Sequence, residues 1–432
     1  MPTAGPDPDR REFLKASTLA AAGLIAPSLF VGGAVAQEAP SDALNVGVIG
    51  LGRGMSHVKT LLEGGKAKLN YVCDVDQNRL AQSMKFLEAK GAPTPQPVQD
   101  FRRLLDDPKL DAVFIATCNH WHAPATILAC SANKHVYVEK PGSHNAREGE
   151  LMVEAARKYK RTVQMGNQRR SYPAIIEAMS KLRSGAIGNV LYARCWYISA
   201  RESIGHGKPA PVPETLDYSL WQGPAPERPY VDNLVHYNWH WRWHWGGGEM
   251  ANNGIHSLDL ARWGLEAEYP TKVSFFGGRY HFQDDQETPD TATAVFDFGG
   301  KGCSWEGSSC HPRRADKTDM VVFYGTEGSL HIEHSGGHRV HDLAGKEVSK
   351  TAASGNDLHH VNNFLECIRS GETPNSEIEI GQKSTLLCHL ANISYKSGRV
   401  IQFDPATRKI VGDADAEKLW SREYRPGWEP KV

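Results

Sequence analysis

Short apolar runs and amphipathic stretches alternate without a break between residues 44 and 168. The apolar runs are LNVGVIG, LNYVCDVD, DAVFIATC, HVYVEK and TVQMGNQ, and between them stand MSHVKTLLEGG, NRLAQSMKFLEAKG, PATILACSANK and NAREGELMVEAARKYK. Strand and helix periods in strict alternation are typical of parallel strands joined by right-handed crossover helices. The sequence therefore predicts an α/β protein whose first domain, residues 43–168, contains a doubly wound parallel sheet.

The alternation of strand-like and helix-like segments ends in the second part of the chain, residues 169–432. A proline-rich crossing, GKPAPVPETLDYSLWQGPAPERPY, is followed by the strand-like runs TKVSFFGGRYHF, DTATAVFDF, GCSWEGSS and MVVFYGTEGSLHIE. Successive strands without intervening helices favour an antiparallel sheet. Two stretches with apolar residues at helical spacing come late, LHHVNNFLECIRSG and IGQKSTLLCHLANISYKSG. We therefore predict a second, α+β domain with an open, largely antiparallel sheet.

A glycine-rich turn follows the first apolar run, in VGVIGLGRGMSHV. Glycine permits a tight strand-to-helix turn and lets a pyrophosphate approach the backbone at the helix N-terminus, as in Rossmann domains. The full GxGxxG pattern is not met, because Met55 occupies the sixth position and the third glycine is Gly54. The glycines alone also fit an ordinary βα turn. The candidate cofactor contacts in the turn are Gly50, Leu51, Gly52 and Arg53.

Asp74 ends the second apolar run, about 20 residues after the glycine turn, where a carboxylate accepts hydrogen bonds from the ribose hydroxyls of a dinucleotide. An acid at this place repels a 2′-phosphate, and no arginine immediately follows it. We therefore expect NAD as the cofactor. NADP remains the alternative, because Arg79 could meet its 2′-phosphate.

Polar clusters also stand at the ends of two later strands, in ATCNHWHAP and VEKPGSHN. Ligands of open α/β sheets bind outside the carboxyl ends of the strands, so these side chains are expected to face the cofactor. The alternative for each cluster is a solvated loop. The candidate contacts are Thr117, Asn119, His120, Trp121, His122, Glu139 and Lys140, together with Asn167.

Four tryptophans occupy every second position from residue 239 to residue 245, in the stretch HYNWHWRWHWGGGEMANNGIHSLDLARW, residues 236–263. In an extended strand the four indoles share one face, and His240, Arg242 and His244 share the other. A single line of histidines without a carboxylate makes a poor metal site, so we expect no metal. We interpret the stretch as a pocket wall, with indoles against sugar C–H groups; the alternative is that the indoles fill a core. The candidate substrate contacts are Arg169, Tyr237, Trp239, Trp241 and His244.

The charges of the 432-residue chain nearly balance, at a formal net charge of −1, so no basic field favours nucleic-acid binding. Residues 1–36 carry a different signal: Arg10 and Arg11 precede FLK, a modest apolar run and a small-residue end, the pattern of a twin-arginine (Tat) export signal. A membrane anchor is the alternative, but glycines and Pro27 interrupt the run. We expect cleavage after Ala36, no stable membrane anchor in the mature chain, and a periplasmic location.

The glycine turn, the EKP strand end and a downstream GGG…G-x-H-x-x-D together resemble the Gfo/Idh/MocA family, from about residue 44 to the C-terminus. That family includes glucose-fructose oxidoreductase, inositol dehydrogenase and the NAD-dependent glycosidases of glycoside hydrolase family 109. FLECIRSGETP and ISYKSGRVIQFDP are also similar to family segments. The resemblance implies a Rossmann domain that binds nicotinamide, a second domain that holds a sugar or polyol ring, and a homo-oligomer, either a dimer or a tetramer.

The resemblance also implies catalytic roles. It makes Lys140 the family's catalytic lysine, before a Lys140–Pro141 bond that can be cis, and His256 the family histidine. Most dehydrogenase members carry an aspartate four residues before that histidine, whereas this chain has Asn252. Oxidation of an alcohol requires a base at the hydroxyl, and we expect His256 in this role with Lys140 stabilising the developing alkoxide. The alternative is a helix histidine bonded to Asp259.

An exported nicotinamide enzyme has no soluble pool that recycles NADH, so we expect redox-neutral chemistry with a tightly held cofactor. The first hypothesis is a carbohydrate oxidoreductase acting on a saccharide or cyclitol. The second is a glycosidase that oxidises, eliminates and reduces again, similar to family 109. The third is a non-catalytic sugar-binding protein on the same fold, with Asn252 as the mark of lost activity.

Overall fold

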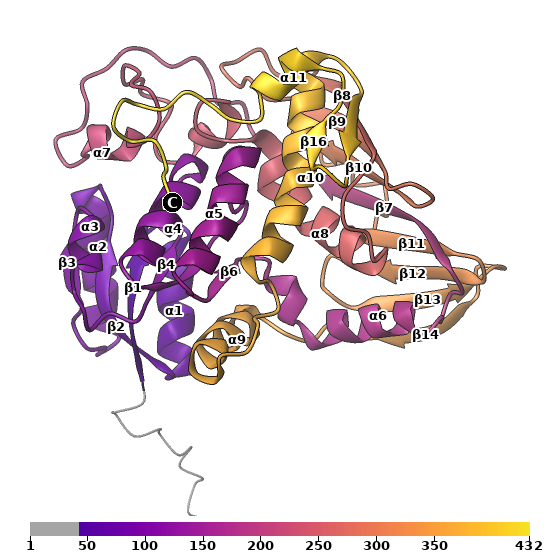
Figure 1. Cartoon of the computed structure of the whole chain (residues 1–432), viewed down its shortest axis with the longest axis horizontal. Coiled ribbons are helices and arrows are strands. Elements are labelled where there is room, and N and C mark those ends of the chain that lie inside the picture. Colours follow the sequence, from indigo (N-terminus) through magenta and orange to yellow (C-terminus); the bar gives the residue numbers. More distant parts are fainter. Residues whose placement is uncertain (1–42) are drawn as a thin grey trace, which may run out of the picture. The chain divides into compact units, whose positions relative to one another are not determined.

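Six parallel strands form the first sheet of the computed structural model, which describes residues 43–432 (Figure 1). The sheet order is β3-β2-β1-β4-β5-β6, so the strand order reverses between β1 and β4. This arrangement confirms the predicted doubly wound parallel sheet. The export-signal pattern lies outside the described residues. The strands are β1 (Leu44–Ile49), β2 (Ala67–Cys73), β3 (Gln96–Val98), β4 (Ala112–Ile115), β5 (His135–Val138) and β6 (Val163–Met165).

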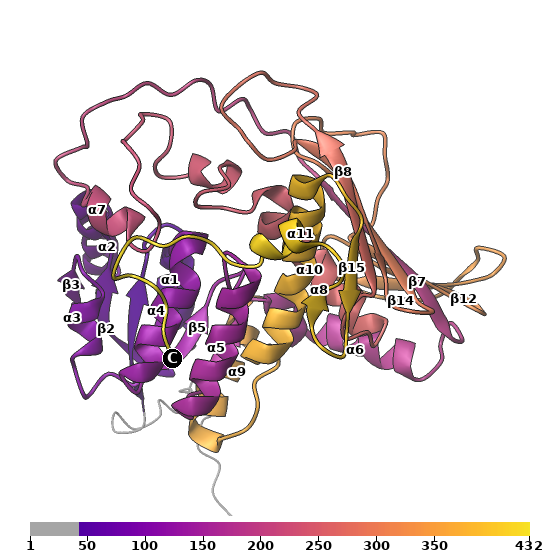
Figure 2. The same ribbon diagram turned by 45° about the horizontal axis from the view of Figure 1, so that its top comes forward.

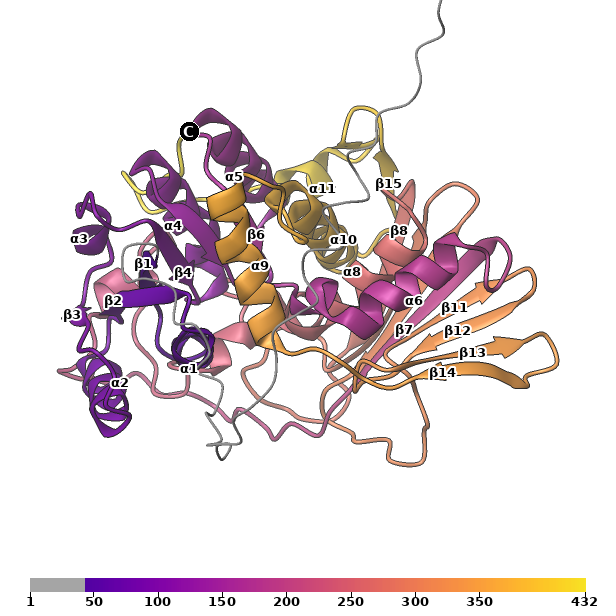
Figure 3. The same cartoon turned by 90° about the horizontal axis from the view of Figure 1, so that it is seen from below.

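Alternate residues of the central strands face two separate cores. Val48 and Phe114 are buried together with side chains of α1 and α9, whereas Ile49 and Ile115 belong to the core that includes α4 and α5. Burial on both faces explains why these strands read as continuous apolar runs. Figure 3 shows α4 on one side of the sheet and α1 on the other. The helices are α1 (Gly54–Gly64), α2 (Gln77–Ala89), α3 (Arg102–Leu105), α4 (Asn119–Ser131), α5 (Ala146–Lys158) and α9 (Asp357–Ser370).

Ten strands form the second sheet, in the order β14-β13-β12-β11-β7-β10-β9-β8-β15-β16. Neighbouring strands are antiparallel except for the pair β7 and β10, which is parallel. The prediction of a largely antiparallel sheet is therefore confirmed. The strands are β7 (Val190–Ile198), β8 (Lys272–Gly278), β9 (Thr291–Asp297), β10 (Gly302–Ser308), β11 (Val321–Gly325), β12 (Gly328–Ile332), β13 (His338–Asp342), β14 (Glu347–Thr351), β15 (Ile401–Asp404) and β16 (Lys409–Ile410).

Helices cover one face of the second sheet. Helix α10 packs against both β8 and α5, and α8 packs on β7 and β11, so both helices lie between the two sheets (Figure 2). The opposite face of the sheet exposes large apolar side chains, among them Phe276 at 60% and Val295 at 43%. The helices and short turns of this part are η1 (Gln168–Ser171), α6 (Pro173–Arg183), α7 (Tyr218–Gln222), η2 (Asn238–Trp241), η3 (Met250–Gly254), α8 (Ile255–Gly264), α10 (Ile378–Ser397) and α11 (Ala414–Lys418).

Residues 199–247, which we call the crossing segment, leave the second sheet after β7 and reach the first domain (Figures 1 and 2). The backbone N–H of Gln77 donates to the carbonyl of Thr215 at 3.0 Å, and the N–H of Asp217 donates to the carbonyl of Val75 at 3.0 Å. The segment is therefore tied by backbone hydrogen bonds to the carboxyl end of β2.

The tryptophan-rich part of the crossing segment is not an extended strand, so that prediction is wrong. Residues 238–241 form the 3₁₀ turn η2, and further turns follow. Trp239, Trp241 and Trp245 are buried, whereas Trp243 is only half-buried. The alternation in the sequence thus reflects several separate environments around turns and not the two faces of one strand. Between residues 43 and 432, we find no helix with the length and apolar character that a membrane crossing requires.

Candidate active site

A cavity of about 660 Å³ lies at the carboxyl ends of β1, β2, β4 and β5, which is where ligands bind in doubly wound sheets. The crossing segment and the η3–α8 region complete its wall. Both predicted regions, the dinucleotide turn and the Lys140/His256 pair, therefore border one space. The predicted cofactor residues that line the cavity are Gly50, Gly52, Arg53, Asp74, Thr117, Asn119, Trp121, His122, Glu139 and Lys140.

The glycine turn after β1 is closely packed. Gly50 has φ +86°, and a Cβ there would lie 2.6 Å from the carbonyl oxygen of Ala116. A Cβ on Gly52 would lie 2.7 Å from Nη1 of Arg79. Residue 50 therefore requires glycine for a backbone reason, whereas a side chain at residue 52 would have to displace only the flexible end of Arg79. Arg79 itself borders the cavity.

Asp74 is fixed at the end of β2 by two backbone donors. Its Oδ2 accepts from the N–H of Leu51 at 2.7 Å, and its Oδ1 accepts from the N–H of Asp76 at 3.0 Å. Nη1 of Arg79 lies 3.9 Å from Oδ2. Burial raises the pKa of Asp74, although the hydrogen bond from Leu51 and the charge of Arg79 partly offset this effect. Leu51 thus serves the site through its backbone and does not itself line the cavity.

Glu139, the acid of the EKP strand end, is buried among donors. Its Oε1 accepts from Nε2 of His57 at 3.0 Å, Nε of Arg53 at 3.1 Å and Nε2 of Gln168 at 3.2 Å. Although burial alone would raise the pKa of Glu139, the hydrogen bond from His57 and the charge of Arg53 hold it well below its usual value. Glu139 therefore stays ionised and anchors the strand end next to Lys140.

Lys140 is held by the backbone of the π-helical turn η3. Its Nζ donates to the carbonyl oxygen of Asn252 at 2.8 Å and to the side-chain Oδ1 of Asn252 at 3.2 Å. Turns of this kind shift the helical hydrogen-bond register and are frequent at functional sites. Burial lowers the pKa of the Lys140 ammonium, and the charge of Glu139 only partly offsets this effect. The Lys140–Pro141 bond is cis.

His256 stands in the first turn of α8 and lines the same cavity. Burial, followed by the charges of Lys140 and Arg169, brings the pKa of His256 well below its usual value, so the ring is neutral. Asp259 is not its partner: both Asp259 oxygens accept from Nε of Arg170, at 2.8 and 2.9 Å. The alternative of a structural His256–Asp259 bond is therefore wrong.

The predicted substrate residues do not all line the same cavity. Tyr237 and Trp239 line the cavity. Trp241 is buried beneath it, with the guanidinium of Arg201 4.8 Å from its ring centre. His244 lies in a different recess, where its Nε2 donates to the carbonyl of Pro226 at 2.8 Å. These positions put the substrate wall at Tyr237 and Trp239 and remove His244 from it.

Three further predicted residues do not line the cavity. Arg169 donates from Nη2 to the carbonyl of His334 at 3.0 Å. His120 is fully buried and donates from Nε2 to the carbonyl of Trp221 at 2.9 Å, which ties α4 to the crossing segment. Asn167 is buried at the end of β6, and both polar atoms of its amide lack a protein partner.

The crossing segment supplies cavity residues beyond the predicted substrate contacts, some of them from the stretch interpreted as a pocket wall. Nε2 of His236 lies 2.8 Å from Oδ2 of Asp76, and Trp221 and His240 also line the cavity. The indole N–H of Trp121 donates to the carbonyl of Leu220 at 3.0 Å. The segment therefore closes the cavity over the end of β2, on the side of Asp74.

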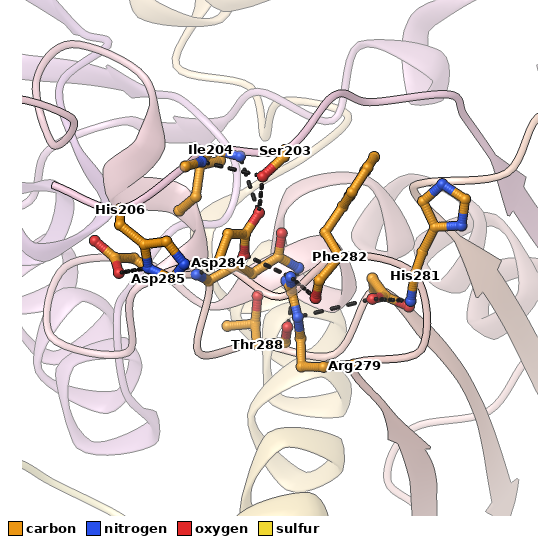
Figure 4. A network of polar contacts seen from close by, with 12 residues as sticks. Ser203, Ile204, His206, Arg279, His281, Phe282, Asp284, Asp285 and Thr288 are labelled. Atoms are coloured by element: carbon orange, nitrogen blue, oxygen red, sulfur yellow. Dashed lines mark hydrogen bonds and ion pairs between the residues drawn. The ribbon is translucent and has the colours of Figure 1, made fainter.

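A polar network fastens the crossing segment to the loop between β8 and β9 (Figure 4). Oδ2 of Asp284 accepts from Oγ of Ser203 at 2.8 Å and from the N–H of Ile204 at 2.9 Å. Asp285 accepts from the N–H of Gly207 at 2.7 Å and pairs with Nη2 of Arg242 at 2.9 Å. The crossing segment is thus anchored both to the first domain and to the loop between β8 and β9 of the second sheet.

The described residues contain no group of three or more His, Cys, Asp or Glu side chains that could hold a metal ion. The site does fit a dinucleotide: a glycine turn in close backbone packing, a fixed acid at the end of β2, and the unpartnered amide of Asn167 all stand at or beside the carboxyl edge of the sheet.

Family comparison divides the chain in the same way as its two sheets. Residues 44–167 match the model "Oxidoreductase family, NAD-binding Rossmann fold" of the Gfo/Idh/MocA group, and residues 195–430 match its "C-terminal alpha/beta domain".

Two kinds of curated relative are similar to the chain. The scyllo-inositol 2-dehydrogenase (NAD(+)) of Bacillus subtilis is 27% identical over 376 residues, which cover 83% of this chain and 95% of that protein. A glycosyl hydrolase family 109 protein of Shewanella pealeana is 29% identical over 209 residues, 44% of this chain. The match spans only 46% of that relative's length.

Solved structures share the fold. The aldose-aldose oxidoreductase of Caulobacter crescentus, complexed with glycerol, aligns with a TM-score of 0.66 at 20% identity, covering 84% of this chain and all of that one. The WlbA dehydrogenase of Bordetella pertussis, in complex with NADH and UDP-GlcNAcA, aligns with a TM-score of 0.64 at 18% identity, covering 84% and 99%.

Proposed function

Because the chain belongs to the Gfo/Idh/MocA oxidoreductase family, we propose that it is an NAD-dependent oxidoreductase acting on CH–OH groups of a saccharide or cyclitol. One observation carries the proposal: a single cavity joins the glycine turn and Asp74 to Lys140, Asn252 and His256. The similarity to an inositol dehydrogenase over most of both chains supports the substrate class.

The chain's own residues divide the work at the reacting oxygen. A bound nicotinamide would supply the hydride acceptor. Lys140 donates a hydrogen bond to the substrate oxygen and stabilises the negative charge that develops there. His256, neutral in its buried position, accepts the hydroxyl proton. The carbonyl of Asn252 holds the Lys140 ammonium in place without neutralising its charge.

NAD is the preferred dinucleotide in this proposal. Asp74 is fixed by the Leu51 N–H in the position from which a carboxylate accepts ribose hydroxyls and repels a 2′-phosphate. Arg79 approaches the same carboxylate to 3.9 Å, so its charge is directed at Asp74. This pairing leaves less of the Arg79 charge available for a phosphate.

We further propose that the cofactor stays bound between turnovers. The contacts of His236 with Asp76 and of His120 with Trp221 hold the crossing segment over the cavity. Tight retention suits a protein exported by the Tat pathway, because the periplasm offers no pool that reoxidises NADH. The chemistry is then redox-neutral: a second carbohydrate is reduced after the first is oxidised.

A glycosidase is the second candidate function. The match to a glycosyl hydrolase family 109 protein over 209 residues favours it. In that chemistry, oxidation of a ring hydroxyl acidifies the neighbouring C–H, and elimination then expels the anomeric group. Water adds to the resulting unsaturated ketone, and the ketone is reduced again by the hydride taken in the first step. The same Lys140 and His256 would serve the oxidation step. A non-catalytic sugar receptor is disfavoured, since it requires neither residue in the cavity.

The bare face of the second sheet supports a homo-oligomer. Phe276, Val295 and Tyr324 are exposed on strands β8, β9 and β11, and large apolar side chains that face solvent gain when another copy covers them. We propose a dimer or tetramer in which this face is covered by another copy.

Purification of the mature protein tests the proposal. We expect nicotinamide dinucleotide, mostly NAD, to remain bound through extensive dialysis at close to one equivalent per chain. Release by acid and chromatography of the supernatant would identify it. Protein that emerges empty and binds NAD more weakly than about 1 mM would contradict tight retention.

A further inference from the structure

A second recess, of about 470 Å³, lies on the other side of the tryptophan-rich turns and shares no lining residue with the cavity. Its walls come from the loop before α5, from residues 226–228 and 243–247 of the crossing segment, from the second half of α10 and from residues 419–423. None of the residues that carry the proposed reaction borders it.

Lys396 brings a positive charge into this recess. Its Nζ lies 4.4 Å from the ring centre of Trp243, and among residues 43–432 no hydrogen bond or ion pair engages it. The side chain reaches solvent within the recess, yet the surrounding protein lowers the pKa of its ammonium to about 8, with Glu287 only partly offsetting this effect. An ammonium in such a place gains from a nearby anion.

Arg422 brings a second charge, and the groups that accept its hydrogen bonds are all neutral. Its Nη1 donates to Nδ1 of His144 at 3.2 Å and to the carbonyl of His244 at 3.0 Å, and its Nε donates to the carbonyl of Glu423 at 3.2 Å. Burial lowers the pKa of the guanidinium, and Glu148 only partly offsets this effect. Its Nη2 has no partner in the described part of the chain, so the guanidinium is positioned but not neutralised.

The other titratable groups of the recess leave these charges in excess. Burial lowers the pKa of His244 to about 4 and of His389 to about 3, so both rings are neutral. Glu227 pairs at 2.6 Å with Arg425, which lies outside the recess lining. Arg228 adds a third cation to the lining and the exposed Glu423 adds one carboxylate, so the cations still outnumber the carboxylates that have no cationic partner.

Glu287 and Glu148, the carboxylates whose charges act on Lys396 and Arg422, have other partners. Oε2 of Glu287 accepts from the N–H of Trp243 at 2.7 Å. Glu148 accepts from the hydroxyl of Tyr424 at 2.9 Å and from the N–H of His144 at 2.9 Å. Neither carboxylate forms an ion pair with Lys396 or Arg422 among the described residues.

We propose that this recess is a binding site for a small oxyanion, the carboxylate, phosphate or sulfate group of a small molecule. Lys396 and Arg422 are its charged ligands, and the guanidinium presents donors in the fork that oxyanions match. The indole of Trp243 offers a flat apolar wall to the rest of the ligand. The site is separate from the proposed reaction and holds whether or not that reaction is correct.

The test titrates the mature protein, kept saturated with NAD so that the dinucleotide phosphate site is filled, with inorganic phosphate, sodium sulfate and D-glucuronate at constant ionic strength. Calorimetry and the thermal midpoint report binding, with D-glucose as the neutral arm. We expect saturable binding of at least one anion and none of glucose at equal concentration. Phosphate and sulfate binding would indicate an inorganic or phosphorylated ligand, and preference for glucuronate would indicate an acidic sugar.

Substitutions locate the binding. Lys396→Gln, at an exposed position that folding tolerates, should lower the affinity for the anion at least 10-fold, and Arg422→Gln should do the same. Lys418→Gln, an exposed lysine on neighbouring α11, is the matched control and should leave binding unchanged. Anion effects no larger than those of sodium chloride, or binding that survives in Lys396→Gln, would overturn the proposal.

Discussion

The Nζ atom of Lys140 donates to the main-chain carbonyl of Asn252 at 2.8 Å, which ties the end of β5 to the π-helical turn before α8. The amide of Asn252 adds a second acceptor at 3.2 Å. At the position where the family resemblance implies an aspartate, this chain thus places a neutral amide beside Lys140. The departure therefore acts on the lysine, whose ammonium contacts the Asn252 side chain directly.

Asn252→Asp therefore changes the pH dependence of the reaction. A carboxylate beside Lys140 favours its ammonium and raises its pKa, which burial now lowers, and it also raises the low pKa of nearby His256. The rate needs Lys140 protonated and His256 neutral, so the alkaline and the acidic limbs should both move to higher pH. Profiles of kcat/KM for the two proteins check this. Superimposable profiles would show that position 252 does not act on the reacting groups.

Cofactor choice depends on Asp74 and its neighbour Arg79. Asp74→Ala removes the acceptor of the ribose hydroxyls and frees the Arg79 guanidinium. The affinity for NAD should therefore fall by roughly 10-fold or more, and the affinity for NADP should rise. In the double variant Asp74→Ala, Arg79→Ala the gain for NADP should vanish, because no cation remains to meet the 2′-phosphate. Dissociation constants from nicotinamide fluorescence measure both effects. An unchanged ratio of the NAD and NADP constants in Asp74→Ala would contradict the assignment.

The grip of the crossing segment can be tested at His236. His236→Ala removes the 2.8 Å contact with Asp76 that holds the segment over the cavity, so bound dinucleotide should dissociate roughly 10-fold faster. His331→Ala loses a contact of the same kind and length, with Asp319 in the second sheet, and serves as the control. Stopped-flow displacement gives the rates. Equal release from both variants would show that the segment does not retain the cofactor.

Two tryptophans four residues apart provide a matched test of which residues form the substrate wall. Trp239 lines the cavity and Trp243 does not. Trp239→Ala should therefore raise the KM for the carbohydrate several-fold, whereas Trp243→Ala should leave it unchanged. Steady-state kinetics with a turned-over sugar measures both. The reverse order of effects would move the substrate away from this wall.

The sequence predicts the parts of the protein in which a local rule determines the structure. Val48 and Ile49 face opposite cores, so the apolar run around them already indicates a strand buried on both sides. The same holds for the glycine turn and Asp74, whose roles follow from the ends of such strands.

The crossing segment follows no such rule. Trp239 and Trp245 are buried in one hydrophobic cluster and Trp241 is buried outside it, in a chain that runs through turns, so their period of two predicts a strand that does not form. His236 and Trp221 reach the cavity through long-range contacts with β2 and α4, and no local pattern marks contacts of that range.

The central claim is that Lys140 and His256 act on a carbohydrate hydroxyl beside a retained nicotinamide. The most direct measurement follows absorbance at the reduced-nicotinamide band while a panel of sugars and cyclitols is added to protein as purified, without added cofactor. At least one compound should change the band within a single turnover, and a second carbohydrate should reverse the change. Lys140→Ala and His256→Ala should keep their dinucleotide and slow the change by roughly 100-fold or more. A band that no carbohydrate alters in protein with full cofactor, or a change of undiminished rate in both variants, would contradict the account.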